Sequence, residues 1–187
     1  MSGRFDVRDT PIAGVRVVQR KPHGDTRGFF ERLYCDDELR PVLQHRAVVQ
    51  INHTRTEHHG TVRGMHFQWP PHAECKFVSC LRGEIFDVAV DVRRDSPTFL
   101  QWHAERLSAD NHRTLVIPEG VAHGFQTLTD ACELLYLHTA HFAPESEGGL
   151  HPQDPRLAIA WPLPVSVLSP RDAAHPMLVD DFAGVEA

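Results

Sequence analysis

The sequence predicts an all-β fold, a sandwich or a barrel, and three observations support this prediction. Short runs rich in β-branched residues recur along the chain, each bounded by polar or turn-forming residues. Turn signals at Gly83, residues 95–97 and residues 118–120 have the close spacing typical of such folds. Helical patterns are scarce. With 187 residues, the chain has the length of one domain, so we expect a single domain over 1–187.

The expected strands follow in chain order. The runs that predict them cover residues 12–18, 47–52, 76–81, 84–92, 114–117 and 134–142. In the clearest run, 84–92, Asp87 and Asp91 share one face, which we expect to look onto water or a polar cavity. A helix can begin at Asp36 or Asp37, but Pro41 limits it to about one or two turns.

The character of the chain changes at about residue 145. Six prolines punctuate the remaining residues, and few periodic runs are found among them. We therefore expect residues 145–187 to form a C-terminal arm that folds back on the body of the same domain.

Composition excludes several classes of protein. The formal net charge is -6, so no basic excess indicates a nucleic-acid partner. No stretch approaches the roughly 18 apolar residues of a membrane helix, so we expect no membrane partner. The charged first ten residues do not resemble a signal peptide, and the four cysteines lack a CxxC spacing. We expect reduced, mostly buried thiols and a cytoplasmic protein.

The 14 histidines raise the question of a metal site. Two segments, 60–66 with a closing Gly83 and 118–123, are similar to the two motifs of cupins. Metal-binding cupins continue the first motif as His-x-His with a nearby glutamate. Here Gln68 replaces the second histidine, and Glu74 is about one place off. The similarity to these motifs thus implies a cupin fold with short helices, and the missing ligands predict that it holds no metal.

Without a metal, the candidates for chemistry are polar residues on the predicted strands. His66 can act as a general base near neutral pH, and the Lys76 ammonium can stabilise a developing oxyanion. Tyr136 can return a proton from another direction. Taken singly, each has an ordinary structural interpretation: a hydrogen-bonded interior histidine, a lysine at a strand edge, a core tyrosine. Together they fit proton abstraction next to a carbonyl.

A series of motifs, in one order from about residue 10 to residue 178, resembles the dTDP-4-dehydrorhamnose 3,5-epimerase family. The motifs are Asp25-x-Arg27-Gly28-x-Phe30, Gln50-x-Asn52, Arg63-Gly64-x-His66-Phe67-Gln68-x-Pro70-Pro71, Lys76-x-Val78, the segments 86–93 and 96–98, Pro118-x-Gly120-x-Ala122-His123-Gly124-Phe125, Asp154-Pro155, Trp161-Pro162 and Leu168-Ser169-x-Arg171-Asp172.

The resemblance implies a jelly-roll homodimer that uses neither a metal nor an organic cofactor. It implies epimerisation of dTDP-4-dehydro-6-deoxy-D-glucose at C3 and C5, the carbons that flank the C4 ketone. By position, His66 is the general base and Asp172 orients it. Lys76 stabilises the O4 enolate, and Tyr136 delivers the proton from the opposite face.

Further positions match contacts of the family to the nucleotide and pyrophosphate. They are Arg27, Gln50, Asn52, Arg63, His123, Glu147 and Arg171. Arginine suits such positions because its planar fork matches phosphate oxygens.

Among the features that depart from the family pattern, two concern the residues that line the expected site. Phe142 stands where close family members have a second active-site tyrosine. Arg63 and His66 are three residues apart, so a regular strand points them to opposite faces, and we expect a bulge at Gly64 to reconcile them.

Three alternatives stay open. The first is a mono-epimerase that acts at C3 only or at C5 only, in the making of a deoxysugar for a secondary metabolite. The others are a metal-dependent cupin enzyme and a non-catalytic cupin that binds nucleotide sugars. Among the other histidines, His138 is a candidate for the pocket and His72 a weaker one. We expect the remaining ten to be exposed: His23, His45, His53, His58, His59, His103, His112, His141, His151 and His175.

Overall fold

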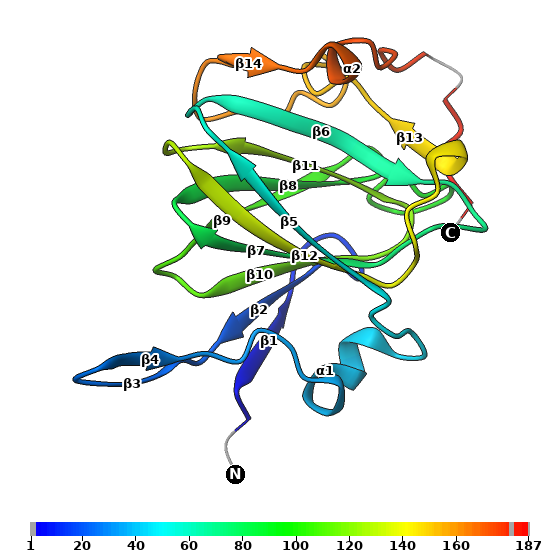
Figure 1. The fold of residues 1–187 in the computed structure, drawn as a ribbon. Helices are drawn as coiled ribbons and strands as arrows, with labels where there is room; N and C mark the ends of the chain where they lie inside the picture. The colour runs from blue at the N-terminus through cyan, green and yellow to red at the C-terminus, as the bar shows by residue number, and fades with distance from the viewer. Residues whose placement is uncertain (1–2, 180–181, 187) are drawn as a thin grey trace.

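Two stacked sheets, most of whose strand pairs are antiparallel, form the body of the computed structural model, which describes residues 3–179 and 182–186 (Figure 1). The strand order is β1-β2-β10-β7-β12-β5 in the first sheet and β13-β6-β11-β8-β9 in the second. Strand β14 joins the second sheet beside β6, and β3 and β4 form a separate hairpin. This arrangement confirms the predicted all-β jelly-roll.

The elements have the following bounds. The first sheet contains β1 (Phe5–Asp9), β2 (Arg16–Arg20), β5 (Gln50–Thr56), β7 (Lys76–Arg82), β10 (Arg113–Ile117) and β12 (Cys132–His138). The second contains β6 (Thr61–Gln68), β8 (Glu84–Asp91), β9 (Trp102–Ser108), β11 (Val121–Thr127), β13 (Glu147–Gly149) and β14 (Val167–Leu168). The remaining elements are β3 (His23–Asp25), β4 (Gly28–Phe30), α1 (Asp36–Leu43), η1 (Pro144–Ser146) and α2 (Pro170–Ala173).

The helices are short, as expected. Helix α1 has 8 residues and contains Pro41. Among the described residues, the structure has no helix long and apolar enough for a membrane span.

The main core lies between the two sheets. It is built from apolar side chains of both, among them Ile85 and Ala89 of β8, Leu115 of β10 and Leu134 of β12. A second cluster covers the outer face of the second sheet, where Val88 and Val90 pack against Leu150 and Leu157 of the C-terminal residues. Both faces of β8 are therefore buried.

Burial of both faces of β8 decides between the two surroundings expected for its aspartates. Asp87 and Asp91 are fully buried, so neither faces water, and Asp87 lies against His123 of the cavity wall. Asp91 accepts hydrogen bonds from Arg93, Ser96 and Thr98 in the following turn. Strand β12 also differs from its prediction, because it ends at His138 and leaves Phe142 in the loop beyond it.

The described part of the C-terminal arm lies against β6. Strand β13 pairs antiparallel with the end of β6, and β14 pairs parallel with its start. Helix α2 follows and sits beside the same strand (Figure 1). Ser169 caps α2 by accepting a hydrogen bond from the Asp172 amide, which fixes Asp172 at the helix start.

The predicted bulge is present in β6. His66 pairs with His123 and Arg63 with Phe125, so β6 has one more residue than β11 between these pairs. Gly64 has a φ of +133°, and a Cβ at this position would lie 2.5 Å from the Gly124 Cα. The bulge therefore requires glycine, and it lets Arg63 and His66 line the same cavity.

Candidate active site

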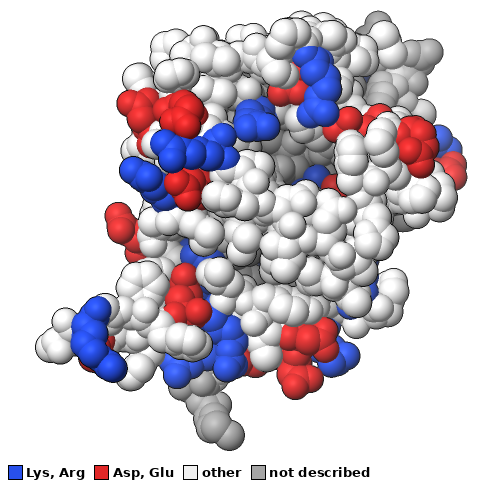
Figure 2. Space-filling view, viewed as in Figure 1, with Lys and Arg blue, Asp and Glu red and all other residues white. Residues whose placement is uncertain are grey.

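A cavity of about 480 Å3 opens between β5, β7 and β12 of the first sheet and β6 and β11 of the second. The space-filling view shows a hollow on this face with basic and acidic side chains at its rim (Figure 2). Nine of the eleven predicted site residues line the cavity: Gln50, Asn52, Arg63, His66, Lys76, His123, Tyr136, Glu147 and Arg171. Asp172 lies behind His66, and Arg27 lies elsewhere.

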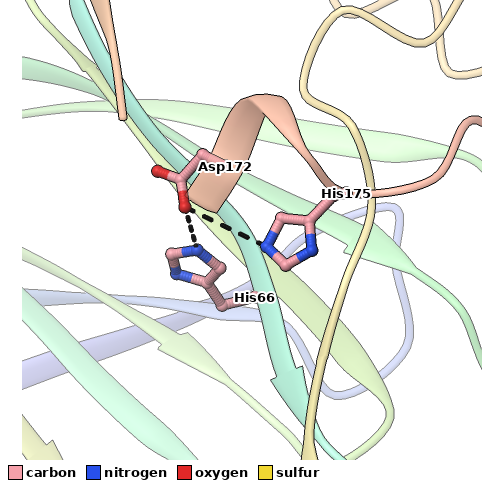
Figure 3. A group of neighbouring side chains, drawn as sticks. All are labelled: His66, Asp172 and His175. Atoms are coloured by element: carbon pink, nitrogen blue, oxygen red, sulfur yellow. Dashed lines mark hydrogen bonds and ion pairs between the residues drawn. The ribbon is translucent and has the colours of Figure 1, made fainter. Parts of the chain in front are cut away.

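His66 and Asp172 form a hydrogen-bonded pair. The His66 Nε2 atom lies 2.8 Å from the Asp172 Oδ1 atom, and Asp172 is almost fully buried (Figure 3). The Gly64 amide donates to Oδ2 over 3.3 Å. Burial alone raises the pKa of Asp172, but the hydrogen bond and charge of His66 outweigh it, and the pKa falls to about 2. The ionised carboxylate thus holds the Nε2 proton and leaves Nδ1 free to accept another.

Lys76 is held by a buried carboxylate. Its Nζ atom lies 2.9 Å from Glu74 Oε1, and Glu74 Oε2 lies 2.7 Å from His138 Nδ1. Burial opposes ionisation of Glu74, but the charges and hydrogen bonds of Lys76 and His138 lower its pKa to about 2. The Lys76 ammonium is therefore fixed within the cavity beside a permanent negative charge.

His123 and Tyr136 occupy the inner part of the cavity wall. His123 Nε2 lies 2.7 Å from Asp87 Oδ1, a carboxylate whose pKa is raised by burial despite the opposing charge of His123. The Tyr136 ring meets His123 edge to face and stacks on His138. Burial, and then the nearby Asp87, raises the pKa of Tyr136. Its phenol is therefore protonated at neutral pH and can donate a proton.

Two arginines flank the mouth of the cavity. Arg171 Nη1 donates to Glu147 over 3.2 Å, and Arg171 Nη2 lies 3.2 Å from His66 Nε2. The exposed Arg63 donates to Thr56 over 3.4 Å. Their guanidinium groups suit the oxygens of a pyrophosphate.

Gln68 occupies the position of a metal-ligating histidine in the cupin motif. Its side-chain amide donates to the His72 carbonyl over 2.8 Å, and its Oε1 accepts from the Ala143 amide over 2.7 Å. The side chain thus ties two loops together and has no amide atom left for a metal. Glu74, the other candidate, is held by Lys76 and His138.

Two cavity residues were only partly recognised in the sequence, and the place of one further histidine outside the cavity was missed. Glu74 was considered only as a misplaced metal ligand, and His138 was left undecided, yet both line the cavity. His175 was expected to be exposed, which is wrong: its side chain is only 16% exposed and its ring lies 5.6 Å from that of His66. His103 and His112 are also mostly buried.

Arg27 is the predicted site residue that this chain does not bring to the cavity. It lies at the tip of the β3–β4 hairpin, where it pairs with Asp25 and its side chain is 87% exposed. Figure 1 shows this hairpin projecting away from the two sheets.

Comparisons with known proteins agree with this geometry. Residues 9–180 match the family described as dTDP-4-dehydrorhamnose 3,5-epimerase. The chain is 43% identical over 171 residues to the enzyme of that name from Salmonella typhimurium, covering 90% of this chain and 93% of the relative.

Solved structures show the same likeness. The dTDP-6-deoxy-D-glucose-3,5-epimerase of Legionella pneumophila, in complex with dTDP-4-keto-L-rhamnose, has a TM-score of 0.90 and 39% identity, covering 98% of both chains. ChmJ, a 3'-monoepimerase from Streptomyces bikiniensis in complex with dTDP-quinovose, has a TM-score of 0.83 and 33% identity, covering 90% of this chain and 85% of that one. The chain belongs to the dTDP-4-dehydrorhamnose 3,5-epimerase family.

Proposed function

We propose that the protein epimerises dTDP-4-dehydro-6-deoxy-D-glucose at C3 and C5 to give dTDP-4-dehydro-L-rhamnose. The observation that carries this proposal is the His66–Asp172 pair, 2.8 Å apart, in a cavity that also presents Lys76 and Tyr136. A base, a fixed cation and a protonated phenol are the groups that inversion next to a ketone requires.

The reaction proceeds through an enolate. His66 Nδ1 takes the proton from the carbon beside the C4 ketone, and the electrons of that C–H bond move to O4. The Lys76 ammonium stabilises the negative O4. Tyr136 then donates its phenolic proton to the opposite face of the carbon, which restores the ketone with inverted configuration. Solvent returns the proton to Tyr136 and removes the one on His66, and the second carbon follows the same steps.

The nucleotide is bound by the polar wall and rim of the cavity. Arg63 and Arg171 hold the pyrophosphate, and Glu147 orients Arg171. Gln50 and Asn52 of β5, with His123 of β11, supply further polar contacts. A cavity of about 480 Å3 lies within the size range of small-molecule sites.

A product analysis tests this function. The purified protein is incubated with dTDP-4-dehydro-6-deoxyglucose, and 1H NMR coupling constants report the configuration at C3 and C5. We expect inversion at both carbons and no conversion by His66→Ala. A substrate left unchanged by the wild-type protein would contradict the proposal.

Mono-epimerisation is the second candidate function. It is supported by Phe142, which lines the cavity without a hydroxyl group, and by the similarity to the 3'-monoepimerase ChmJ. The same NMR spectra decide between the candidates, because inversion at one carbon alone would select this second function.

The protein acts as a homodimer in this proposal. The β3–β4 hairpin carries Phe29 and Phe30, which are 65% and 66% exposed, and Ile51 on the edge strand β5 is 63% exposed. A second copy that covers these side chains removes apolar surface from water. In such a dimer, we expect Arg27 of one chain to reach the cavity of the partner chain.

Mixed dimers test this role of Arg27. One chain carries Arg27→Ala and the other His66→Ala, with different tags so that the mixed dimer can be purified. If Arg27 serves the partner, one cavity of the mixed dimer is intact and activity returns. If Arg27 serves its own chain, neither cavity is intact and the mixed dimer is as inactive as either parent.

We also propose that the protein works in the reducing cytoplasm. All four cysteines are free, and three are buried. Burial raises the pKa of the Cys75 and Cys80 thiols to about 12, so they are unreactive. Fractionation of cells that make the protein tests this location, and we expect the protein in the cytoplasmic fraction.

A further inference from the structure

We propose that His66, Asp172 and His175 form a binding site for a divalent transition-metal ion such as Zn2+, and that the bound ion inhibits epimerisation. Figure 3 shows His66 on β6 facing Asp172 and His175 of the arm, with both rings directed toward the Asp172 carboxylate. The three ligand atoms, two imidazole Nε2 atoms and one carboxylate oxygen, lie within 4.8 Å of one another. The inhibitory part of the proposal rests on the proposed epimerase function; the binding part does not.

The distances suit a small tetrahedral ion. His66 Nε2 lies 2.8 Å and His175 Nε2 lies 4.0 Å from Asp172 Oδ1. Zinc ligands lie about 2.0–2.2 Å from the ion, so neighbouring ligands of a tetrahedral ion are about 3.3 Å apart. Shifts of about 1 Å in the three side chains reach this arrangement. Two histidines and one carboxylate also leave a fourth position open for water.

His175 is the third ligand of the proposed metal site, in addition to the His66–Asp172 pair. Its Nε2 atom is buried and has no hydrogen-bond partner among the described residues, which is uncommon because an unpaired buried polar atom costs free energy. Gly149 provides the space for the ring, since a Cβ there would lie 2.2 Å from it. The proposed reaction makes no use of His175. A metal ion would give its free nitrogen a partner.

Arg171 is the group that opposes a cation here. Its Nη2 atom lies 3.2 Å from His66 Nε2, and its Nε atom lies 3.6 Å from Asp172 Oδ1. The side chain is 58% exposed and already donates to Glu147, so it can turn away from the pair toward that carboxylate. Removal of the guanidinium, as in Arg171→Gln, is therefore expected to tighten metal binding.

Inhibition follows from the atoms that the ion would use. The ion takes the lone pair of His66 Nε2, so this nitrogen loses its proton and its hydrogen bond to Asp172. The imidazole attached to a cation is a weaker base at Nδ1.

Binding of Zn2+ alone tests the site. Metal-free protein is titrated calorimetrically, and Co2+ is added separately to record the visible absorption of a tetrahedral site. We expect one ion per wild-type chain and a loss of affinity of at least about tenfold in His175→Ala and His175→Gln. The glutamine variant keeps the bulk of the side chain in case alanine disturbs the arm. His141→Ala, an exposed histidine outside the cavity, is the control that should bind like wild type.

The activity of the same proteins tests the consequence. Metal-free His175→Gln should retain wild-type kcat and KM, whereas Zn2+ should inhibit the wild type and spare this variant. His138→Gln distinguishes the site from the other histidine–carboxylate pair beside Lys76, and it should bind Zn2+ like the wild type. Equal Zn2+ affinity in His175→Gln and wild type, or none in either, would overturn the site. Binding without inhibition would overturn the inhibitory role alone, and a protein inactive without metal would count against the epimerase function instead.

Discussion

Asp172 and His66 are 106 residues apart in the chain, yet the Asp172 Oδ1 and His66 Nε2 atoms lie 2.8 Å apart. The C-terminal arm creates this contact. Strand β14 adds to β6, Ser169 caps α2, and Asp172 at the start of α2 then faces His66 across the bulge at Gly64. The arm thus contributes a residue to the candidate active site.

Asp172→Asn tests the function of this contact. Asparagine keeps the shape of the side chain but removes the charge that orients and stabilises a protonated His66. We expect kcat to fall by about 10²–10⁴-fold with little change in KM. Asp154→Asn is the control, because Asp154 is also buried in the arm and accepts hydrogen bonds from the backbone amides of Arg156 and Leu178. A similar loss of kcat in both variants would assign Asp172 a structural role only.

Removal of the Glu74 charge should destabilise the protein. Glu74→Gln leaves the buried Lys76 ammonium without its carboxylate. Breaking a buried ion pair in this way costs about 3–5 kcal/mol of unfolding free energy. Urea denaturation measures it, with the exposed Glu145→Gln as the control. Equal unfolding midpoints for the two variants would show that the pair adds nothing to stability.

The same carboxylate predicts how stability depends on pH. The pKa of Glu74 is lowered from 4.5 to about 2 by folding, so its contribution is present above pH 4.5 and is lost as the pH falls toward 2. We expect the unfolding free energy of the wild type to fall more steeply over this range than that of Glu74→Gln. Parallel pH profiles would contradict the buried ionised state.

The bulge in β6 gives a prediction with a matched control. Gly64 and Gly28 have nearly the same φ, +133° and +135°, but a Cβ at Gly64 meets the Gly124 backbone whereas one at Gly28 meets nothing within 4 Å. Both Gly→Ala variants strain the backbone by about 1–3 kcal/mol. Only Gly64→Ala should also displace His66 and lower kcat. Gly28 adjoins Arg27 in the hairpin, so any effect of Gly28→Ala on catalysis is expected in KM and not in kcat. An equal kcat for the two variants would show that the bulge does not position His66.

Sequence patterns predicted most of the fold because strand alternation and turn residues are local signals. For the same reason the sequence singled out His66, Lys76 and Tyr136, which line the cavity. The family motifs added Asp172, which lies against His66. The features that the sequence did not predict depend on how segments far apart in the chain pack against one another. Asp87 was expected to face water or a polar cavity, and nothing in 84–92 reveals that both faces of β8 are covered, which excludes water.

Two other misses have the same origin. The Glu74–His138 pair requires that β7 and β12 lie side by side, with His138 opposite Lys76, and this register is not visible in either strand alone. The burial of His175 depends on the path of the arm over Gly149. For Arg27 the sequence and the structure of the single chain differ. A family motif predicts that Arg27 is a site residue, but in the single chain it lies outside the cavity.

The central claim, that His66 removes protons from both carbons beside the ketone, is tested most directly by isotope exchange in deuterium oxide. The wild-type protein is incubated with dTDP-4-dehydro-6-deoxyglucose, and NMR measures deuterium at C3 and C5. The account predicts deuterium at both carbons with the wild type and at neither with His66→Asn. Deuterium at one carbon only, or undiminished exchange in His66→Asn, would contradict it.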